Sequence, residues 1–323
     1  MGPPRLHSAA SRKRKTLGMT VQTPAPFVIT GGNTGMGYET ALALSQSGRA
    51  VVIACRSPEQ GQRAARQIQA QGGAAPVSVV RLDLASLVSV RACAGELRSR
   101  YERLAGLICN AGIMTPPYRR TENGYESQFQ VNYLGHFLLT QLLIELLRGG
   151  ASLISISSLS SEKGRCDSAE EFFAVGRCDM SSYDAMRAYR ESKLAQVLFT
   201  AEAQRRLGAA GVVASAVHPG VVNTGLFYRN GPAWLQRVVQ PLAWIGYATG
   251  RLRTPAQGAT TAIDLGLRGT SVCGGQYWAD KQPRAPNPRL YNERLCAALW
   301  EASLAAVSEP GRSVTTPAAQ PSQ

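Results

Sequence analysis

Residues 27–37 read FVITGGNTGMG, a short apolar run that passes directly into a turn holding four glycines. The run at 27–30 is typical of a buried parallel strand, and residues 38–46 have the composition of a helix. Glycines at a strand-to-helix turn permit a tight bend and bring backbone amides to the helix N-terminus, where a phosphate group is stabilised. The turn therefore favours a nucleotide-binding fold, with a simple connecting turn as the alternative.

Outward from this turn, short apolar runs alternate with segments of helical length. A strict succession of strand, helix and strand predicts a parallel sheet, and right-handed crossovers then favour a doubly wound arrangement. We therefore expect an α/β fold with a single doubly wound parallel sheet of Rossmann type and helices on both faces. The expected strands are 27–30, 50–55, 77–82, 104–109, 152–157, 212–217 and 275–279. The expected helices are 38–46, 58–71, 86–101, 125–148, 186–207, one that begins near 254, and 292–307.

The composition indicates one large domain between two loose ends. Hydrophobic residues make up 44% of the 323 residues and charged residues 17%, which suffices for a large core. Residues 1–24 are predicted to be a disordered basic arm, 25–307 the domain, and 308–323 a flexible tail. The net charge of +14 fits either an anionic cofactor or a solvated basic surface. We expect no nucleic-acid partner, because a groove motif of aromatic and basic residues is missing.

Neither a membrane span nor a metal site is predicted. The most apolar stretch, 134–147, is too short to cross a bilayer, and residues 1–24 lack the apolar region of a secretory signal. Seven cysteines without a Cys-x-x-Cys pair favour reduced thiols. His136 and His218 have no second ligand at metal-binding spacing, so both are expected to be structural. We expect a cytoplasmic protein, with peripheral membrane contact left open.

The ends of the next three strands predict the nucleotide. Cys55-Arg56-Ser57 offers no acid for a ribose 2′-hydroxyl, whereas a guanidinium can fork onto a 2′-phosphate. This favours NADP over NAD, with a solvent-facing arginine as the alternative. Asp83-Leu84 ends the third strand, where the acid could accept from the adenine amino group. Asn110-Ala111-Gly112 ends the fourth, where small residues would let the chain pass under the cofactor.

Candidate catalytic residues follow the fourth and fifth strands. Tyr189 and Lys193 share one face of a predicted helix, and the ammonium would favour the phenolate of Tyr189. Taken alone, such a pair is common on exposed helix faces. Ser157-Ser158 follows the fifth strand, at the edge where such sheets bind ligands. Asn132 lies in the helix after the fourth strand, where an amide more often faces solvent or caps the helix.

Together these motifs resemble the short-chain dehydrogenase/reductase family over residues 25–307. Its order and spacing are matched by the glycine turn, Asp83, Asn110-Ala111-Gly112, Asn132, Ser158, Tyr189-x3-Lys193 and Pro219-Gly220. Within the family, four segments resemble the retinol dehydrogenase branch and the related light-dependent protochlorophyllide reductases. They are Cys55-Arg56, the run Asn-Tyr-Leu-Gly-His-Phe at 132–137, His218-Pro219-Gly220 and Leu299-Trp300. The resemblance implies that 25–307 is an NADP-binding catalytic domain.

The resemblance also implies roles for individual residues. Tyr189 would be the proton donor and Ser158 would polarise the carbonyl, being preferred over Ser157 on the family pattern alone. Lys193 would hold the nicotinamide ribose and keep Tyr189 acidic, and Asn132 would anchor a water that resupplies protons. The cofactor, NADPH or NADP+, would be bound by Gly31, Asn33, Thr34, Gly35, Met36, Gly37, Arg56, Asp83, Leu84, Asn110, Ala111, Gly112, Tyr189, Lys193, Pro219, Gly220, Val222 and Thr224.

Two features depart from the family pattern. Ser158 and Tyr189 are 31 residues apart, farther than in most of the family, and the contribution of the extra loop to the pocket stays open. The protochlorophyllide reductases are similar to one another in having a cysteine at the position of Ala195. The alanine in this chain weakens the interpretation as a light-dependent reductase.

The expected substrate is a bulky apolar small molecule. Residues 224–253 are rich in aromatic side chains, and Phe227, Trp234 and Trp244 are predicted to form a lid over the nicotinamide, with packing onto the core as the alternative. We expect NADPH-dependent reduction of a ketone or aldehyde, with oxidation of the alcohol as the reverse reaction. A catalytically silent NADP-binding regulatory or scaffold protein and a double-bond reductase of the protochlorophyllide reductase type stay open, as does a homo-oligomer.

Overall fold

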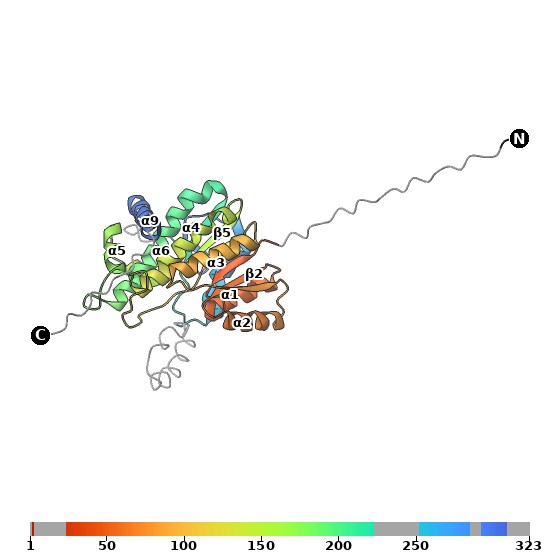
Figure 1. The fold of residues 1–323 in the computed structure, drawn as a ribbon, viewed down its shortest axis with the longest axis horizontal. Coiled ribbons are helices and arrows are strands. Elements are labelled where there is room, and N and C mark those ends of the chain that lie inside the picture. Colours follow the sequence, from red (N-terminus) through yellow and green to blue (C-terminus); the bar gives the residue numbers. More distant parts are fainter. Residues whose placement is uncertain (1, 3–23, 223–251, 285–291, 309–323) are drawn as a thin grey trace, which may run out of the picture.

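The computed structural model describes residues 2, 24–222, 252–284 and 292–308. Within them one sheet has the strand order β3-β2-β1-β4-β5-β6-β7-β8 (Figure 1). The strands are β1 Phe27–Thr30, β2 Val51–Cys55, β3 Val77–Arg81, β4 Gly106–Cys109, β5 Ala151–Ile156, β6 Val212–Val217, β7 Gln276–Ala279 and β8 Gln282–Arg284.

The sheet is doubly wound as predicted, and the order reverses between β1 and β4. Strands β1 to β7 pair in parallel, whereas β8 pairs antiparallel with β7. The predicted parallel sheet is confirmed, and β8 adds an antiparallel edge strand that the sequence did not predict. Asp280 and Lys281 form the two-residue turn of the hairpin with φ of 54° and 60°, a conformation usually signalled by asparagine and glycine.

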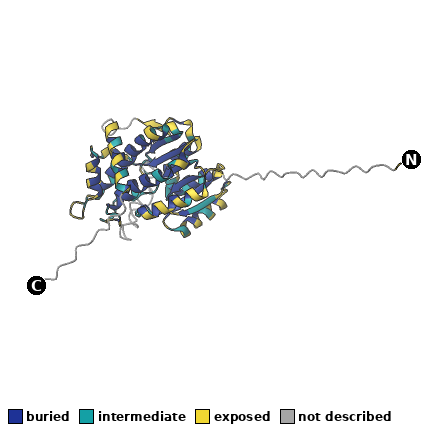
Figure 2. Cartoon of the chain, turned by 45° about the horizontal axis from the view of Figure 1, so that its top comes forward, coloured by how far each residue is buried: buried dark blue, intermediate teal, exposed yellow. Residues whose placement is uncertain are grey.

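Helices lie on both faces of the sheet, as predicted. Successive strand residues face opposite sides of the sheet, so the buried residues of the two layers form separate clusters. Figure 2 shows the strands of the sheet largely in the colour of buried residues. The helices are α1 Gly35–Gln46, α2 Pro58–Ala70, α3 Leu87–Arg100, α4 Gly135–Leu147, α5 Ala169–Gly176, α6 Ala185–Leu207, α8 Pro255–Arg268 and α9 Glu293–Ser308. The first cluster holds α3, α4, α6 and α9 against β-strand residues such as Val28, Val52, Leu107 and Leu153. The second holds α1, α2 and α8 against Ile29, Ile53, Ile108 and Ile154.

The predicted helix 125–148 is interrupted. Residues Phe129–Leu134 form a π-helical turn, and α4 begins only at Gly135, whose N–H reaches Gln130 O. Glu126, which is fully buried, accepts from the N–H groups of Gln128 and Phe129 at 2.9 Å each. This carboxylate satisfies the first donors of the turn and so starts it where it does.

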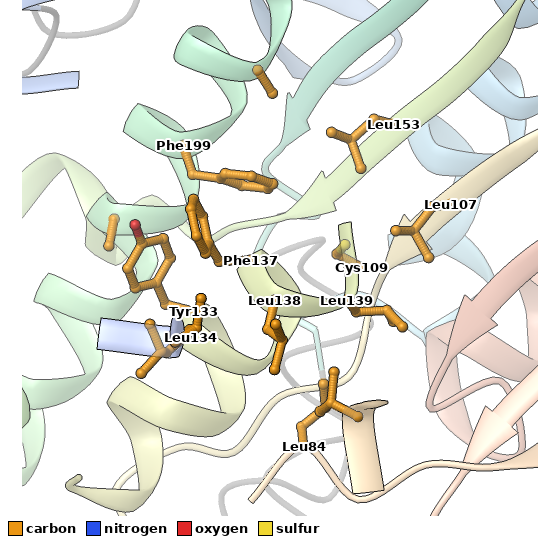
Figure 3. Packing of buried hydrophobic residues seen from close by; sticks show 14 of the residues in the cluster. Leu84, Leu107, Cys109, Tyr133, Leu134, Phe137, Leu138, Leu139, Leu153 and Phe199 are labelled. Atoms are coloured by element: carbon orange, nitrogen blue, oxygen red, sulfur yellow. The ribbon is translucent and has the colours of Figure 1, made fainter. Parts of the chain in front are cut away.

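The last helix packs across α6 and α4 through aromatic rings. Trp300 lies with its ring centroid 5.1 Å from that of Phe137 and 5.8 Å from that of Phe199, and Figure 3 shows Phe137 and Phe199 meeting between α4 and α6. α9 lies beside α5 at one end of the molecule (Figure 1). No helix among the described residues is long and apolar enough to cross a membrane.

Candidate active site

The glycine turn after β1 has a backbone that only glycine adopts without strain. Gly31 and Gly35 have φ of +65° and +57°. A Cβ on Gly37 would lie 2.4 Å from Gly31 O and 2.5 Å from Asn110 Nδ2, so a side chain there has no room. Thr34 precedes α1 without capping it through its side chain, which leaves the first helical N–H groups for another acceptor. These features fit a pyrophosphate at the helix N-terminus.

The ends of β1 and β4 are joined by hydrogen bonds of the Thr30 side chain. Its Oγ1 accepts from the N–H groups of Asn110 and Ala111 at 2.9 Å each, and Asn110 Nδ2 donates to Thr30 O at 2.8 Å. A Cβ on Gly112 would lie 3.2 Å from Asn132 Oδ1 and 3.4 Å from Lys193 Nζ. The backbone after β4 therefore runs directly beside the predicted catalytic residues, with space only for a small residue.

The tip of β2 presents Arg56 to solvent, followed by the cap of α2. Ser57 Oγ accepts from Gln60 N at 3.2 Å and donates to Glu59 Oε2 at 2.7 Å. Asn33 Nδ2 donates to Gln60 Oε1 at 3.3 Å, which brings the glycine turn and the start of α2 together. Glu59 is a carboxylate that the sequence-based argument did not weigh at this tip.

The end of β3 is closed by a local turn. Asp83 Oδ1 accepts from Ala85 N at 3.0 Å, and Asp83 N donates to Ser89 Oγ at 2.9 Å. One carboxylate oxygen of Asp83 thus supports its own loop. Leu84 is buried beside it, and its backbone carbonyl would lie 2.8 Å from a Cβ on Gly135, so this loop lies against the start of α4.

The two serines after β5 have different partners. Ser157 is buried and donates to Lys193 O at 2.8 Å, so its hydroxyl supports α6. Ser158 is partly exposed, and its side chain is close enough to Tyr189 to offset part of the rise in the pKa of the phenol. The structure therefore places Ser158, and not Ser157, against the phenol, a distinction that the residues alone left open.

Burial governs the charges of the Tyr-x3-Lys pair. It raises the pKa of Tyr189 above its usual value, and the Ser158 side chain offsets only part of this rise. Burial also lowers the pKa of Lys193 to about 7. Lys193 Nζ lies 5.9 Å from the centre of the Tyr189 ring. The phenol is therefore held protonated, which is the form that donates a proton, and the expected lowering of its pKa by Lys193 stays a prediction.

Asn132 is buried in the π-helical turn and faces neither solvent nor a helix end. Its Oδ1 accepts from Ile113 N at 2.8 Å, and its Nδ2 donates to Ile113 O and to Ser192 Oγ at 3.0 Å each. The side chain thus connects the segment after β4 to α6. Its backbone carbonyl lies 3.0 Å from His136 Nδ1, and the role of Asn132 in anchoring a water stays a prediction.

Sequence comparison places the chain among known proteins. Residues 26–169 match the family model described as short chain dehydrogenase. Dehydrogenase/reductase SDR family member 13 of Homo sapiens is 39% identical over 279 residues, which cover 85% of this chain and 71% of the relative. Retinol dehydrogenase 13 of Mus musculus is 38% identical over 302 residues, which cover 90% of this chain and 87% of the relative. The chain belongs to the short-chain dehydrogenase/reductase family.

Solved structures agree with this assignment. A crystal structure of a protein from Mycobacterium Paratuberculosis is 31% identical, with a TM-score of 0.67 and coverage of 88% of this chain and 95% of that one. The Pseudomonas aeruginosa RhlG/NADP active-site complex is 24% identical with a TM-score of 0.58, covering 79% and 94%, and supports the fold alone. Membership confirms the predicted family and its retinol dehydrogenase-like branch, and makes the chain an NAD(P)-dependent oxidoreductase of alcohols and carbonyls.

The long segment between Ser158 and Tyr189 of this dehydrogenase/reductase is ordered by a residue that the sequence-based argument missed. Glu191, between Tyr189 and Lys193, is 2% exposed. Its carboxylate accepts from Arg165 N at 2.8 Å and from Cys166 N at 3.2 Å. Beyond this junction the segment forms α5 and packs near the π-helical turn, where a Cβ on Gly176 would lie 2.5 Å from a Phe129 ring atom. The one available signal in the sequence was a charged residue between Tyr189 and Lys193, the two predicted catalytic positions.

The loop after β6 is described as far as Val222. Gly220 has φ of +83°, and Arg253 Nη1 donates to Pro219 O at 3.2 Å. Val222 forms an isolated bridge with Arg253 just before α8. The predicted nicotinamide contact Thr224 and the predicted lid residues Phe227, Trp234 and Trp244 lie outside the described residues.

Proposed function

We propose that the protein uses NADPH to reduce the carbonyl group of a bulky apolar ketone or aldehyde, with Tyr189 as the proton donor. The position of the Ser158 side chain next to the partly exposed Tyr189 is the observation that carries the proposal, because the two hydroxyls then lie together at the carboxyl edge of β5. Ligands of doubly wound sheets bind at that edge, near the point where strand order reverses.

The residues of the chain then have distinct tasks. Ser158 orients the carbonyl oxygen toward the phenol, and the protonated Tyr189 donates to the oxygen as negative charge develops there. Lys193 stabilises the phenolate that remains, since an ammonium near the ring favours the charged form. When bound, the nicotinamide supplies the hydride. Asn132 holds the backbone at Ile113, which fixes one side of the site.

The preference for NADPH rests on the tip of β2. Arg56 is exposed there, and Ser57 caps α2, so the first two residues after the strand are polar and free of carboxylates. A guanidinium recognises a phosphate through two parallel hydrogen bonds. Glu59 hydrogen-bonds with Ser57 and is the group that would oppose a 2′-phosphate. A comparison of the affinities for NADPH and NADH would show whether the attraction of Arg56 for the 2′-phosphate outweighs the repulsion by Glu59.

The substrate class rests on the aromatic side chains of 224–253 and on the names of the relatives, which include retinol dehydrogenases. A retinoid aldehyde is therefore the first compound to test. We extend the proposal to a peripheral contact of this segment with a membrane, through which a lipophilic substrate would arrive.

The test is NADPH oxidation across retinaldehyde and a panel of apolar ketones, aldehydes and quinones, in wild type and Tyr189→Phe. We expect turnover in the wild type and a loss of about two to four orders of magnitude in the variant, with NADPH binding retained. Tight NADPH binding without turnover of any compound would instead support a silent binding protein. Reduction of a carbon–carbon double bond alone would support the reductase alternative, and near-normal turnover by Tyr189→Phe would refute the role of the phenol.

A further inference from the structure

The ammonium of Lys193 is buried and held by two neutral oxygens. Lys193 is 5% exposed, and its Nζ donates to Ile156 O and to Gln196 Oε1 at 2.9 Å each. Ile156 O is fixed because it belongs to the last residue of β5. Gln196 Oε1 belongs to a side chain on α6, three residues after Lys193 and seven after Tyr189, so the three residues share one face of the helix.

Among the described residues, the titratable groups that face this ammonium bring no anion to it. They are Tyr189 on α6, Cys109 on β4 and His136 on α4. Burial raises the pKa of Cys109 to about 12 and that of Tyr189 above its usual value, so both are neutral at pH 7. Burial lowers the pKa of His136 to about 4, so it is neutral as well. The charged state of Lys193 therefore depends on hydrogen bonds to uncharged oxygens.

Gln196 occupies its position at a cost to stability. The residue is 1% exposed, and its Nε2 has no hydrogen-bond partner among the described residues. A buried donor without a partner costs about 1–3 kcal/mol. Its helical neighbours Ala195 and Val197 are buried and apolar, so a leucine of similar volume would remove the unpaired donor. A costly amide that touches Lys193 indicates a task at the active site.

We propose that Gln196 is a positioning residue of the reaction, whose amide oxygen holds the Lys193 ammonium charged and beside Gly112. This inference rests on the function proposed above, in which the charged Lys193 stabilises the phenolate of Tyr189. A Cβ on Gly112 would lie 3.4 Å from Lys193 Nζ, so displacement of the ammonium would change the surface on which the cofactor is expected to lie.

Two substitutions at this position should move the titration of Lys193 in opposite directions. Gln196→Leu removes the acceptor, so the pKa of Lys193 should fall by about one unit, the shift expected from one lost hydrogen bond to a charged group. Gln196→Glu places a carboxylate at the same oxygen, so the pKa should rise. Gln204→Leu is the matched control on α6, because Gln204 Oε1 accepts from Ala214 N at 2.8 Å and does not touch Lys193.

The titration can be measured without turnover. The chain has five lysines, Lys13, Lys15, Lys163, Lys193 and Lys281, so a protein labelled with carbon-13 at lysine Cε gives a simple spectrum. The Lys193 signal is assigned by its loss in Lys193→Arg. Opposite shifts of its midpoint in Gln196→Leu and Gln196→Glu, with none in Gln204→Leu, would support the proposal. Unchanged midpoints, or shifts of both variants in one direction, would overturn it.

The pH profile of kcat/KM then connects the titration to the reaction. We expect the alkaline limb of Gln196→Leu to move to lower pH by about one unit. A purely structural role predicts lower stability and an unmoved limb, which would refute the proposal. If the wild type turns over no carbonyl compound, the proposed function fails, and the lysine midpoints still decide whether Gln196 governs Lys193.

Discussion

His136 should make the folded protein sensitive to acid. The side chain is 1% exposed, with Nε2 lying 2.9 Å from Thr30 Oγ1 and Nδ1 lying 3.0 Å from Asn132 O. A carbonyl oxygen can only accept, so Nδ1 carries the ring proton and donates it to Asn132 O, and Nε2 of the neutral ring is left as an acceptor. Thr30 Oγ1 already accepts from two backbone N–H groups. A second ring proton would therefore meet no free acceptor among the described residues.

The size of the effect follows from the pKa. Burial lowers the pKa of His136 from 6.5 to about 4. Below pH 6.5 the unfolded chain binds a proton at this position before the folded chain does, so acid favours unfolding. The contribution of His136 is fully present above the unfolded pKa and is lost as the pH falls through the folded one. We expect the free energy of unfolding to fall by about 3 kcal/mol across this window because of this one residue.

The assay is reversible urea unfolding of wild type and His136→Asn at a series of pH values from about 7 down to 4. At neutral pH the variant should be less stable by about 1–3 kcal/mol, because the hydrogen bond with Thr30 is lost. The two stability curves should then converge as the pH falls. Curves that stay parallel would refute the assignment of a buried neutral imidazole. His218→Asn is the control, since His218 is only partly buried and should change the slope less.

Three further substitutions test other parts of the structure. Arg56→Ala should weaken NADPH binding about tenfold or more in a fluorescence titration and leave NADH unchanged, and equal losses for both would contradict the phosphate contact. Glu191→Ala should lower both kcat and melting temperature, because the backbone that follows Ser158 loses two acceptors; an unchanged kcat would show that this loop does not position the serine. Trp300→Ala should lower the free energy of unfolding by about 3–5 kcal/mol in urea unfolding, since the ring is 3% exposed, and a change below about 1 kcal/mol would mean that α9 is dispensable.

The sequence predicted the sheet well because its central strands are buried on both faces. Runs such as those at 27–30 and 212–217 coincide with β1 and β6. The glycine turn was equally visible, because the constraint acts on the backbone and only glycine meets it. Helix α8 begins at Pro255 beside the predicted position near 254, where Thr254 and Gln257 form a capping box.

Other features could not be predicted because they depend on burial or on turn residues that carry no typical sequence signal. The π-helical turn depends on the buried carboxylate of Glu126, whereas periodicity alone predicts a continuous helix over 125–148. The hairpin of β7 and β8 turns on Asp280 and Lys281, which carry no typical turn signal. The pKa values of Tyr189 and Lys193 depend on burial, which spacing within a helix does not reveal.

The buried polar groups on α6 differ in how fully their hydrogen bonds and charges are paired. Glu202 is 1% exposed but is paired with Arg205 and Arg206, as a structural carboxylate should be. Within the part of the chain that the structure describes, Lys193 donates to two neutral oxygens, and Gln196 Nε2 has no partner. An apolar residue at either position would avoid a desolvation cost. The amide with the unpaired donor thus lies three residues after Lys193 on α6, in the part of the helix that carries the proposed catalytic residues.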